Sequence, residues 1–387
     1  MLKVLLVLVG FFCTQITSWA GPSEDLLTNL RQRIHDLPSG SGSLIKSFTN
    51  HSQSYIYDQA LAIIAFTKEG DKVHAEKLLK GLATLQQPDG SLYFSYYLDG
   101  KSPYPIEGDK RFAGAIAWVA LAATHYQHKF KSKTYLDFNR RVLSYLESQM
   151  RGIKINGVTT KAVVFAPTDI PATDWKENEI AALEHNLDAY SAFTHFNRVN
   201  QEQKWATTSH ELQSFIIALW DKKHDHFWSG ANIKNGEINK SEFYLDNQSW
   251  SLLALDQSLL KHLKPIKALK KNCDSLFVKH DGVEGFMDSK PTRRPASHKF
   301  VWSEGTLGQV LAMSKLEKIH KTKLTCQGKK SSDYLKNIFK MKKSDGGIAY
   351  STPTLNPDFT NASSVAGTTW LYFAISDFNP FHVEGLN

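Results

Sequence analysis

The sequence predicts an all-α protein in which about six helical hairpins close into a ring. Two kinds of helical segment alternate along the chain, and segments of the buried kind recur at similar intervals. No linker rich in proline or serine divides the chain. Like segments at a regular interval are typical of a repeat architecture, in which each unit stacks on its neighbours. Residues 21–387 are therefore expected to form a single domain.

The first residues are predicted to be a signal peptide. Lys3 provides a positive charge, residues 4–12 are apolar but too few to cross a bilayer, and residues 18–20 match a small-x-small cleavage site. Cys13 could indicate a lipoprotein, but two phenylalanines stand before it in place of the small residue expected. No later segment approaches about 20 consecutive apolar residues. We expect cleavage after Ala20, a secreted or periplasmic product, and no membrane span in the mature chain.

Six segments are apolar on almost every side of a helix, so protein must surround them. They cover residues 57–66, 113–123, 188–196, 247–255, 304–313 and 366–375. Amphipathic segments of the surface type lie between them, as in residues 75–85, 134–150, 211–220 and 332–341. Anchors at Tyr57, Ala115, Asp188, Gln248, Thr306 and Gly367 are 58, 73, 60, 58 and 61 residues apart. A closed double ring with the apolar helices inside is favoured over an open solenoid, whose helices would not be so uniformly apolar.

Glycine-containing turns separate the helical segments. The strongest turn signals are residues 88–91, 235–236, 281–282 and 345–347. Short aromatic or β-like runs follow two of them, at residues 91–97 and 347–350. We expect these runs to form hairpins or strands at one mouth of the ring.

Charge and cysteine content bear on partners and cofactors. The formal net charge is +8 and the sequence pI is near 9.1, which favours acidic partners. The lysines are scattered and no nucleic-acid-binding motif is present, so an anionic glycan is a better candidate than nucleic acid; the charge could also serve solubility alone. Cys273 and Cys326 could form a disulfide or remain free thiols, and no zinc-ligand spacing surrounds them. No metal or other cofactor is predicted, and a monomer is expected.

Three motifs stand at or just before the starts of predicted inner helices: residues 57–60 (YDQA), 184–190 (EHNLDAY) and 302–306 (WSEGT). Together with the periodicity of the whole chain, they resemble the six-hairpin glycosidase-type (α/α)6 toroids, which include glycoside hydrolases and some polysaccharide lyases. The resemblance implies that the starts of the inner helices line a substrate cleft. It does not identify one glycosidase family, and fold alone does not fix function.

Glycosidic hydrolysis usually needs two carboxyl groups that flank the bond. Candidates at predicted helix starts are Asp58, Glu184, Asp188, Asp246 and Glu304. Glu184 is the preferred general acid because Asp188, four residues later on the same helix face, would raise its proton affinity. Asp58 is the preferred partner of Glu184. For each carboxylate the alternative is a structural role at the helix start, where acidic residues meet the positive end of the helix dipole.

Aromatic and polar residues near these carboxylates are candidates for substrate binding. They are Tyr55, Tyr57, Arg111, Trp118, His185, Asn186, Tyr190, Trp250 and Trp302. The sequence thus favours a glycoside hydrolase acting on a polysaccharide or oligosaccharide. Two alternatives remain open. A polysaccharide lyase acting on a uronic-acid glycan would use Glu184, His185, Asn186 and Tyr190, and a non-catalytic ring would bind glycans through its aromatic residues alone.

Overall fold

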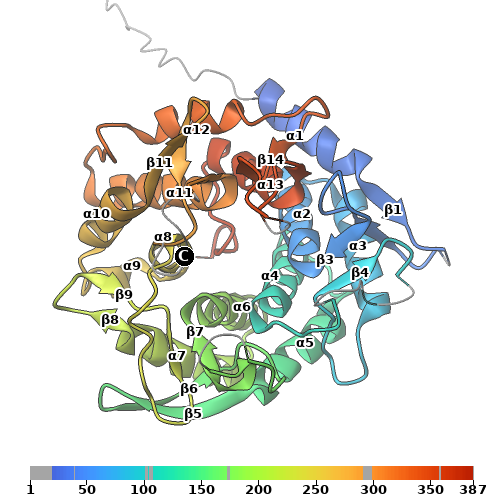
Figure 1. Cartoon of the computed structure of the whole chain (residues 1–387). Coiled ribbons are helices and arrows are strands. Elements are labelled where there is room, and N and C mark those ends of the chain that lie inside the picture. Colours follow the sequence, from blue (N-terminus) through green and yellow to red (C-terminus); the bar gives the residue numbers. More distant parts are fainter. Residues whose placement is uncertain are drawn as a thin grey trace, which may run out of the picture.

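The computed structural model describes residues 20–38, 40–100, 103, 108–171, 175–290, 299–356 and 359–386. The predicted signal segment before Ala20 lies outside these residues. Within them, twelve helices form two concentric rings (Figure 1). The inner helices are α2 (Ile56–Glu69), α4 (Ala113–Phe130), α6 (Leu183–Asn200), α8 (Leu245–Ala254), α11 (Ser303–His320) and α13 (Val365–Ile375). The outer helices are α1 (Ala20–Gln32), α3 (Lys72–Leu85), α5 (Leu136–Ser148), α7 (Gln203–Ala218), α10 (Pro265–Leu276) and α12 (Ser331–Phe339). A short helix, α9 (Gln257–Leu260), connects α8 to α10.

The inner ring is closed. Each inner helix packs on the next one along the chain, and α13 packs on α2. The outer helix α1 packs against α13, so the first and last described helices meet where the ring closes. This arrangement confirms the predicted double ring and all six predicted inner helices. The sequence did not single out α1 or α10 as outer helices.

Burial differs between the two rings as the apolar patterns predict. Every residue of α8 is buried, and in α13 all but the last residue are buried. The outer helix α5 instead buries one face, through Phe138, Val142 and Leu146 among others, and leaves charged residues in solvent. Inner helices are therefore held by neighbours on all sides, and outer helices by one apolar face.

A polar side chain at the fourth position of five inner helices ties each helix to the backbone before it. Both polar atoms of the Gln59 amide bond to the backbone of Ile45, and Gln248 binds Phe227 in the same way. The equivalent residues are Asn186, Thr306 and Thr368, which bond to Val163, Phe286 and Ile348. These bonds satisfy backbone groups that would otherwise be buried without partners.

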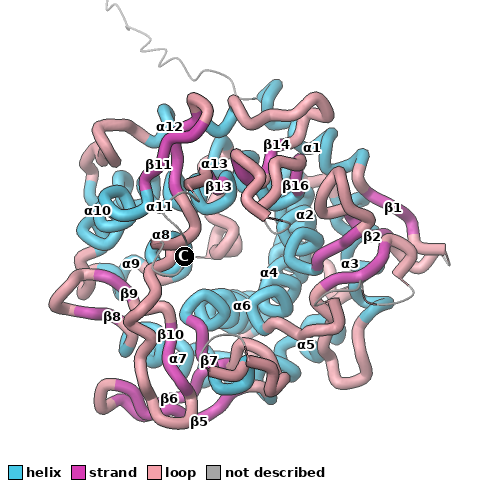
Figure 2. The backbone as a smooth tube through the Cα atoms, in the orientation of Figure 1, coloured by secondary structure: helices cyan, strands magenta, loops and turns pink. Residues whose placement is uncertain are grey.

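The described strands are short and pair in two-stranded antiparallel sheets spread around the ring (Figure 2). Local hairpins are β1 (Ile34–Asp36) with β2 (Ser43–Ile45), β5 (Met150–Ile155) with β6 (Val158–Val163), β8 (Trp220–Asp221) with β9 (His226–Phe227), and β11 (Phe277–His280) with β12 (Val283–Phe286). Longer-range pairs are β3 (Gln53–Tyr55) with β4 (Ser95–Tyr97), β7 (Ile180–Ala182) with β10 (Gly230–Asn232), β13 (Val301–Trp302) with β15 (Ser351–Thr352), and β14 (Ile348–Ala349) with β16 (Ser363–Ser364).

These strands mark one mouth of the ring. The strands β3, β7, β13 and β16 each end at the residue before an inner helix begins. We call the end of the ring where the inner helices begin the mouth. The predicted runs at residues 91–97 and 347–350 do contain strands, β4 and β14, but each pairs with a distant segment and not within a local hairpin.

The inner wall is layered because equivalent helix positions meet around the ring. The second residues of the six helices are Tyr57, Gly114, Glu184, Asp246, Glu304 and Ala366. One turn deeper stand Leu61, Trp118, Asp188, Trp250, Gly308 and Trp370. One further turn brings an alanine in every helix, at positions 65, 122, 192, 254, 312 and 374, all of them buried. Small side chains in this third layer leave room inside the ring.

The C-terminal segment, residues 376–386, packs against the end of the ring opposite the mouth and lies inside the outline of the ring in Figure 1. The Phe381 ring lies 4.8, 5.5 and 6.4 Å from the rings of Trp118, Trp250 and Trp370. Polar contacts join the segment to the C-terminal halves of five inner helices, through Lys68, His125, Arg198, Leu253 and Ser314. The indoles of the second layer therefore rest on a plug formed by this segment.

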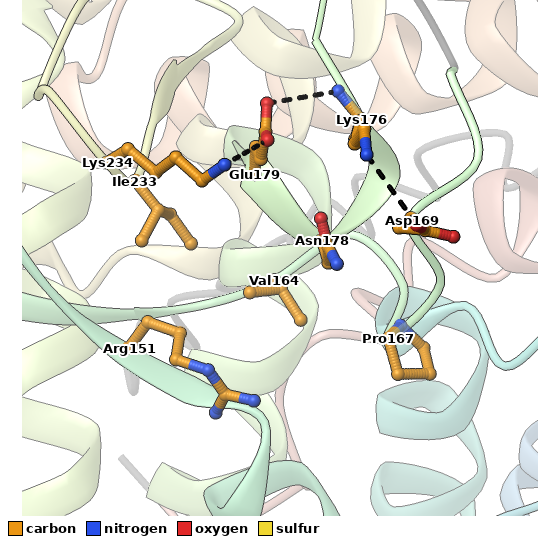
Figure 3. A pocket seen from close by; sticks show the side chains of 9 residues that line it. All are labelled: Arg151, Val164, Pro167, Asp169, Lys176, Asn178, Glu179, Ile233 and Lys234. Carbon is orange, nitrogen blue, oxygen red and sulfur yellow. Dashed lines mark hydrogen bonds and ion pairs between the residues drawn. The ribbon is translucent and has the colours of Figure 1, made fainter.

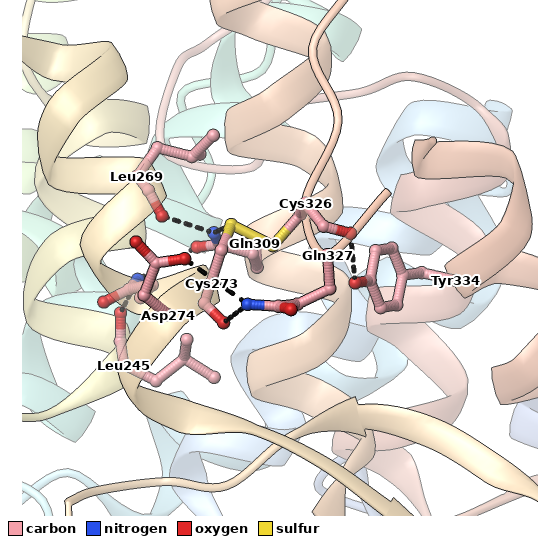
Figure 4. Close-up of a disulfide and its surroundings, with 9 residues drawn as sticks. Leu245, Leu269, Cys273, Asp274, Gln309, Cys326, Gln327 and Tyr334 are labelled. Carbon is pink, nitrogen blue, oxygen red and sulfur yellow. Dashed lines mark hydrogen bonds between the residues drawn. A yellow bond between two sulfur atoms is a disulfide. The ribbon is translucent and has the colours of Figure 1, made fainter. Parts of the chain in front are cut away.

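A disulfide joins Cys273 on α10 to Cys326, which follows α11 (Figure 4). The two Cα atoms are 5.3 Å apart. Gln327 donates to the backbone carbonyl of Cys273, and Tyr334 donates to that of Cys326. Closing a loop of 53 residues stabilises a fold by about 4 kcal/mol in the chain-entropy model. In the part of the chain described here, no helix has the length and apolar character needed to cross a membrane.

Candidate active site

Three consecutive inner helices place a carboxylate at their second residue. These are Glu184 on α6, Asp246 on α8 and Glu304 on α11. Asp188 lies one turn deeper, below Glu184. Every pair among these four carboxylates is electrostatically repulsive. We call these four residues the carboxylate cluster.

Helix capping does not account for the cluster. The residues just before α6, α8 and α11 are Ala182, Tyr244 and Trp302, and none makes a side-chain hydrogen bond to its helix. Asp246 accepts a bond from the adjacent Asn247 N–H at 2.6 Å. The described structure shows no such local bond for Glu184, Asp188 or Glu304. Local bonds to the start of their own helices therefore do not explain the presence of these three carboxylates.

Burial and mutual repulsion raise the proton affinity of the whole cluster. Burial first, and then the charge of Glu304, raise the pKa of Glu184 to about 7. Burial is also the main reason why the pKa of Glu304 rises to about 8. The pKa values of Asp188 and Asp246 are raised further by burial and by the charge of Glu184. No described lysine or arginine forms an ion pair with any of the four.

Glu304 is held by hydroxyl groups. The Tyr57 hydroxyl donates a short hydrogen bond to Glu304 Oε1 and accepts one from Trp370 Nε1 at 2.9 Å. Tyr350 is a second hydroxyl donor to the same carboxylate. Donors of this kind stabilise the ionised form of a carboxyl group. Glu304 therefore has hydrogen-bond donors that stabilise its ionised form, and Glu184 has none among the described residues.

Glu184 is the most accessible member of the cluster. Asp188 and Glu304 are each 2% exposed and Asp246 is 8% exposed, whereas the Glu184 side chain is partly exposed at the mouth. No hydrogen bond to Glu184 is formed within the described residues. A carboxyl group with a raised pKa, solvent access and no fixed partner can give its proton to a ligand.

Asp58 is placed differently from the other predicted carboxylates. It is 3% exposed, interacts with the Ser47 hydroxyl and the Ala366 N–H, and is attracted by the charge of Arg33. Burial outweighs these contacts and raises the pKa of Asp58 to about 7. The charge of Asp58 raises the pKa of Glu304, and Asp58 is not among the causes that raise the pKa of Glu184. The structure therefore brings Glu184 together with Glu304 and Asp246, and does not set Asp58 directly against Glu184.

An unbroken series of aromatic contacts runs along part of the mouth. From α6 it passes through His185, Phe165, Phe112, Phe94 and Tyr55, with ring centroids 4.4 to 5.0 Å apart. It continues through Phe48, Tyr350, Phe359 and Trp302. Tyr55, Phe94, Phe165, Tyr350 and Phe359 are partly exposed. Partly exposed rings beside carboxylates suit the apolar faces of sugars as well as their hydroxyl groups.

Two predicted binding residues lie beneath the cluster. Trp118 and Trp250 belong to the second layer, with ring centroids 6.0 Å apart, and Trp250 stacks on Trp370 at 5.6 Å. The Trp118 indole also approaches Asp188. Both indoles are 1–2% exposed, so they form the floor under the cluster rather than its accessible surface.

The structure places three other predicted residues away from a common site. Arg111 pairs with Asp89 at 3.2 Å and lies over the ring of Tyr93. The buried amide of Asn186 is fully used by Val163 and Ala182. Tyr190 is directed toward Asp256 and Arg198, near the C-terminal plug. His185 stacks on Phe165, and burial lowers its pKa to about 4.

Sequence reasoning did not single out Tyr350, Phe165 or Trp370. Trp370 had a usable signal, because it holds the same position in its apolar segment as Trp118 and Trp250 hold in theirs. Tyr350 and Phe165 lie in irregular segments, where periodicity gives no guide. Within the described residues, no group of three or more His, Cys, Asp or Glu side chains could hold a metal ion.

Comparison with known proteins identifies the fold. No family model matches the chain, and no curated protein sequence does. Among solved structures, a sugar epimerase from a ruminal bacterium superposes with a TM-score of 0.68 at 10% identity, over 92% of this chain and 98% of that one. Cellobiose 2-epimerase from Bacillus thermoamylovorans B4167 gives a TM-score of 0.65 at 13% identity, over 92% and 99% of the two chains. A family 76 α-mannanase from Bacteroides thetaiotaomicron gives 0.63 at 12% identity, over 93% and 95%.

These structures share the (α/α)6 toroid that the sequence predicts. Their identity to this chain is low, so the likeness establishes the fold and leaves the reaction to be argued from the site.

Proposed function

We propose that this protein is a carbohydrate-active enzyme that hydrolyses a glycosidic bond in a polysaccharide or oligosaccharide. The observation that carries the proposal is the carboxylate cluster: several buried acids with raised pKa values, one of them accessible, beside partly exposed aromatic rings. Hydrolysis needs one carboxyl group that is protonated near neutral pH and a second that acts as base or nucleophile.

Glu184 is the proposed general acid and Glu304 its proposed partner. The charges of Glu184 and Glu304 raise the pKa values of the acidic residues around them. The carboxylate cluster therefore takes up and releases protons as one coupled group. The hydroxyls of Tyr57 and Tyr350 favour negative charge on Glu304. Burial outweighs these donors, and the pKa of Glu304 is the higher of the two, about 8 against about 7 for Glu184. Glu184 is assigned as the acid because its side chain is the accessible one and forms no hydrogen bond within the described residues. Asp188 and Asp246 would maintain the raised proton affinity of Glu184.

We also propose that the protein acts outside the cytoplasm. The predicted signal peptide supports this, and so does the Cys273–Cys326 disulfide, because disulfides persist mainly in oxidising compartments.

The alternatives gain less support from the geometry. A polysaccharide lyase would use His185, Asn186 and Tyr190, but these side chains do not meet at one site. The Asn186 amide is hydrogen-bonded to the backbone of Val163, and Tyr190 is directed toward the C-terminal plug. A glycan-binding ring without activity would not need a cluster of buried acids, whose ionised forms are costly to bury.

The test is hydrolysis by the purified mature chain against a panel of glycans. New reducing ends, unsaturated products and epimerised sugars would be resolved by chromatography. We expect Glu184→Gln and Glu304→Gln each to lower the turnover of the cleaved glycan by about 10²–10⁴-fold, the usual contribution of a positioned acid or base.

Glu237→Gln, at an exposed glutamate, is the matched control and should retain activity. Circular dichroism would confirm that each variant is folded. Unchanged hydrolysis by Glu184→Gln would refute the assignment of the acid. An epimerised sugar without new reducing ends would replace the proposed hydrolysis by epimerisation.

A further inference from the structure

A recess lies beside the strand β7, which leads into the start of α6 (Figure 3). It has a volume of about 510 Å³ and is formed by β5, by residues 164–169 and 176–179, and by the residues that follow β10. We call it the rim pocket. None of its lining residues belongs to the carboxylate cluster or to the aromatic series.

The rim pocket carries an uncompensated positive charge. Lys234 forms an ion pair with Glu179, and Lys176 lies 3.6 Å from Asp169. Arg151 has no carboxylate partner among the described residues. Its guanidinium donates to the backbone carbonyls of Ser148 and Met150, at 2.8 and 2.9 Å, through a single nitrogen. The other guanidinium N–H groups remain available to a ligand.

The remaining lining suits a small polar molecule. Val164, Pro167 and Ile233 provide apolar walls, and Asn178 adds a side-chain amide. Figure 3 shows the Arg151 guanidinium and the Asn178 amide on opposite sides of Val164, with Pro167 across the pocket from all three. Apolar walls with a few polar groups are characteristic of sites for small ligands. A planar guanidinium is the side chain best suited to bind a carboxylate through two hydrogen bonds.

The rim pocket is close enough to the carboxylate cluster to hold part of the same ligand. Glu179 lines the pocket, and five residues of chain, mostly the strand β7, lead from it to Glu184. Five extended residues span at most about 17 Å. On the other side, Val164 in the pocket precedes Phe165, which stacks on His185 at the start of α6.

We propose that the rim pocket binds an acidic sugar residue, a uronate, of the glycan that the carboxylate cluster cleaves. Arg151 would bind the carboxylate of the uronate and Asn178 a neighbouring hydroxyl. The inference rests on the proposed function, because only a glycan that reaches the carboxylate cluster gives the pocket a role in catalysis.

The positive charge of the rim pocket and the acidic side chains of the carboxylate cluster would together orient the glycan. A uronate at the mouth would meet four acidic side chains and be repelled, whereas the rim pocket attracts it. The bond cleaved would then join neutral sugars, with the acidic residue a few units away. The same arrangement agrees with the net charge of +8, which favours acidic glycans over long distances.

The test is ligand-observed NMR with D-glucuronate, and with D-glucose as the neutral match. We expect saturation transfer from the wild-type protein to glucuronate and none to glucose. Arg151→Gln should weaken glucuronate binding at least about tenfold, the loss expected for a charge-assisted hydrogen bond. Arg141→Gln, at an exposed arginine on α5, is the matched control and should bind like the wild type. Equal binding of glucuronate by Arg151→Gln and the wild type would overturn the proposal, and so would the absence of binding.

A third variant separates this inference from the proposed function. Glu184→Gln should bind glucuronate like the wild type while losing hydrolysis. If glucuronate binding depends on Arg151 but no glycan is cleaved by the wild type, the rim pocket stands and the hydrolase proposal fails. If Glu184→Gln abolishes hydrolysis but glucuronate binds nowhere, the hydrolase proposal stands and the rim pocket fails.

Discussion

At the residue scale, Tyr57 connects the floor of the site to the carboxylate cluster. Its hydroxyl accepts a hydrogen bond from Trp370 and donates one to Glu304. Glu304 is buried, so this donor offsets part of the cost of its negative charge. The tyrosine ring also contacts Trp118, at a centroid distance of 5.5 Å.

Tyr57→Phe removes both hydrogen bonds and keeps the ring. We expect the pKa of Glu304 to rise further, because its ionised form loses a donor. If Glu304 must be ionised for catalysis, the acidic limb of the pH–activity profile moves to higher pH. The buried Trp370 N–H loses its partner, at a cost of about 1–3 kcal/mol in the free energy of unfolding. Activity profiles over pH and urea denaturation would measure the two effects. An unchanged acidic limb would contradict a role for Tyr57 through Glu304.

Asp58, Glu304 and Asn186 show which properties of the site cannot be predicted from the sequence. Asp58 and Glu304 both stand in the first turn of an apolar helix beside an aromatic residue, and the sequence does not distinguish them. Their neighbours in the structure distinguish them. Arg33 and Ser47 lie beside Asp58, and Tyr350, about 300 residues later in the chain, lies beside Glu304. Asn186 shows the same limit, because its use by Val163 depends on a strand pairing that periodicity does not reveal.

At the scale of elements, α4 lies close against α6 beside the carboxylate cluster. Gly114 lies at the second position of α4, where a Cβ atom would be 2.6 Å from His185 Cδ2 and 2.7 Å from Asp188 Oδ2. Gly114 therefore allows α4 to lie directly against the part of α6 that carries Glu184 and Asp188.

Gly114→Ala would force these two helices apart. We expect a loss of about 1–3 kcal/mol in the free energy of unfolding, the usual cost of overpacking, together with reduced activity because α6 carries Glu184. Gly152→Ala on β5 is the matched control, since a Cβ atom there would meet no atom within 4 Å. Urea denaturation of both variants gives the comparison. Equal stability of the two would show that α4 and α6 can separate at little cost.

Elements were the level best predicted from the sequence. All six inner helices follow from segments without a polar face, because no other packing buries them. The outer helix α10 is equally amphipathic, but it begins at Pro265 after a short irregular stretch and was not singled out. The strands were only partly predictable, because β4 pairs with β3, which precedes both α2 and α3, and β14 pairs with β16 across the intervening β15.

At the scale of the whole molecule, the plug formed by residues 376–386 joins the inner helices through buried histidines. His125 is 5% exposed, and its ring nitrogen bonds to the carbonyl of Pro380. The rings of His195 and His382 lie 4.9 Å apart. Burial lowers the pKa of His125 and of His382 to about 4 and that of His195 well below its usual value.

This arrangement predicts a loss of stability in acid. A histidine whose pKa is lowered in the folded state stays neutral while the unfolded chain takes up a proton, so stability falls as pH drops from about 6.5 toward 4. For His125 the loss at pH 5 is about 2 kcal/mol. The carboxylate cluster has the opposite effect on stability. Its raised pKa values make the folded state bind more protons than the unfolded chain between about pH 4 and 8, so its contribution to stability increases as the pH falls.

His125→Gln isolates the histidine contribution and retains a donor for Pro380. We expect the free energy of unfolding to fall less between pH 7 and pH 5 in this variant than in the wild type, by about 2 kcal/mol. Urea titrations at both pH values would measure it, with His210→Gln, at an exposed histidine of α7, as the control. The same pH dependence in His125→Gln and the wild type would contradict the buried, neutral state of His125.

The contact between α13 and α2 also limits how such a molecule can vary. An open repeat array can gain or lose a unit at its end, and it needs terminal units with a polar outer face. A closed ring has no terminal unit, and a hairpin added or removed anywhere would have to open a contact between two neighbouring inner helices. The number of hairpins is thus fixed by closure, whereas the segments between helices at the mouth are free to differ in length. New ligand specificities on this scaffold would arise by changes in those segments, such as residues 164–179, and not by extension of the ring.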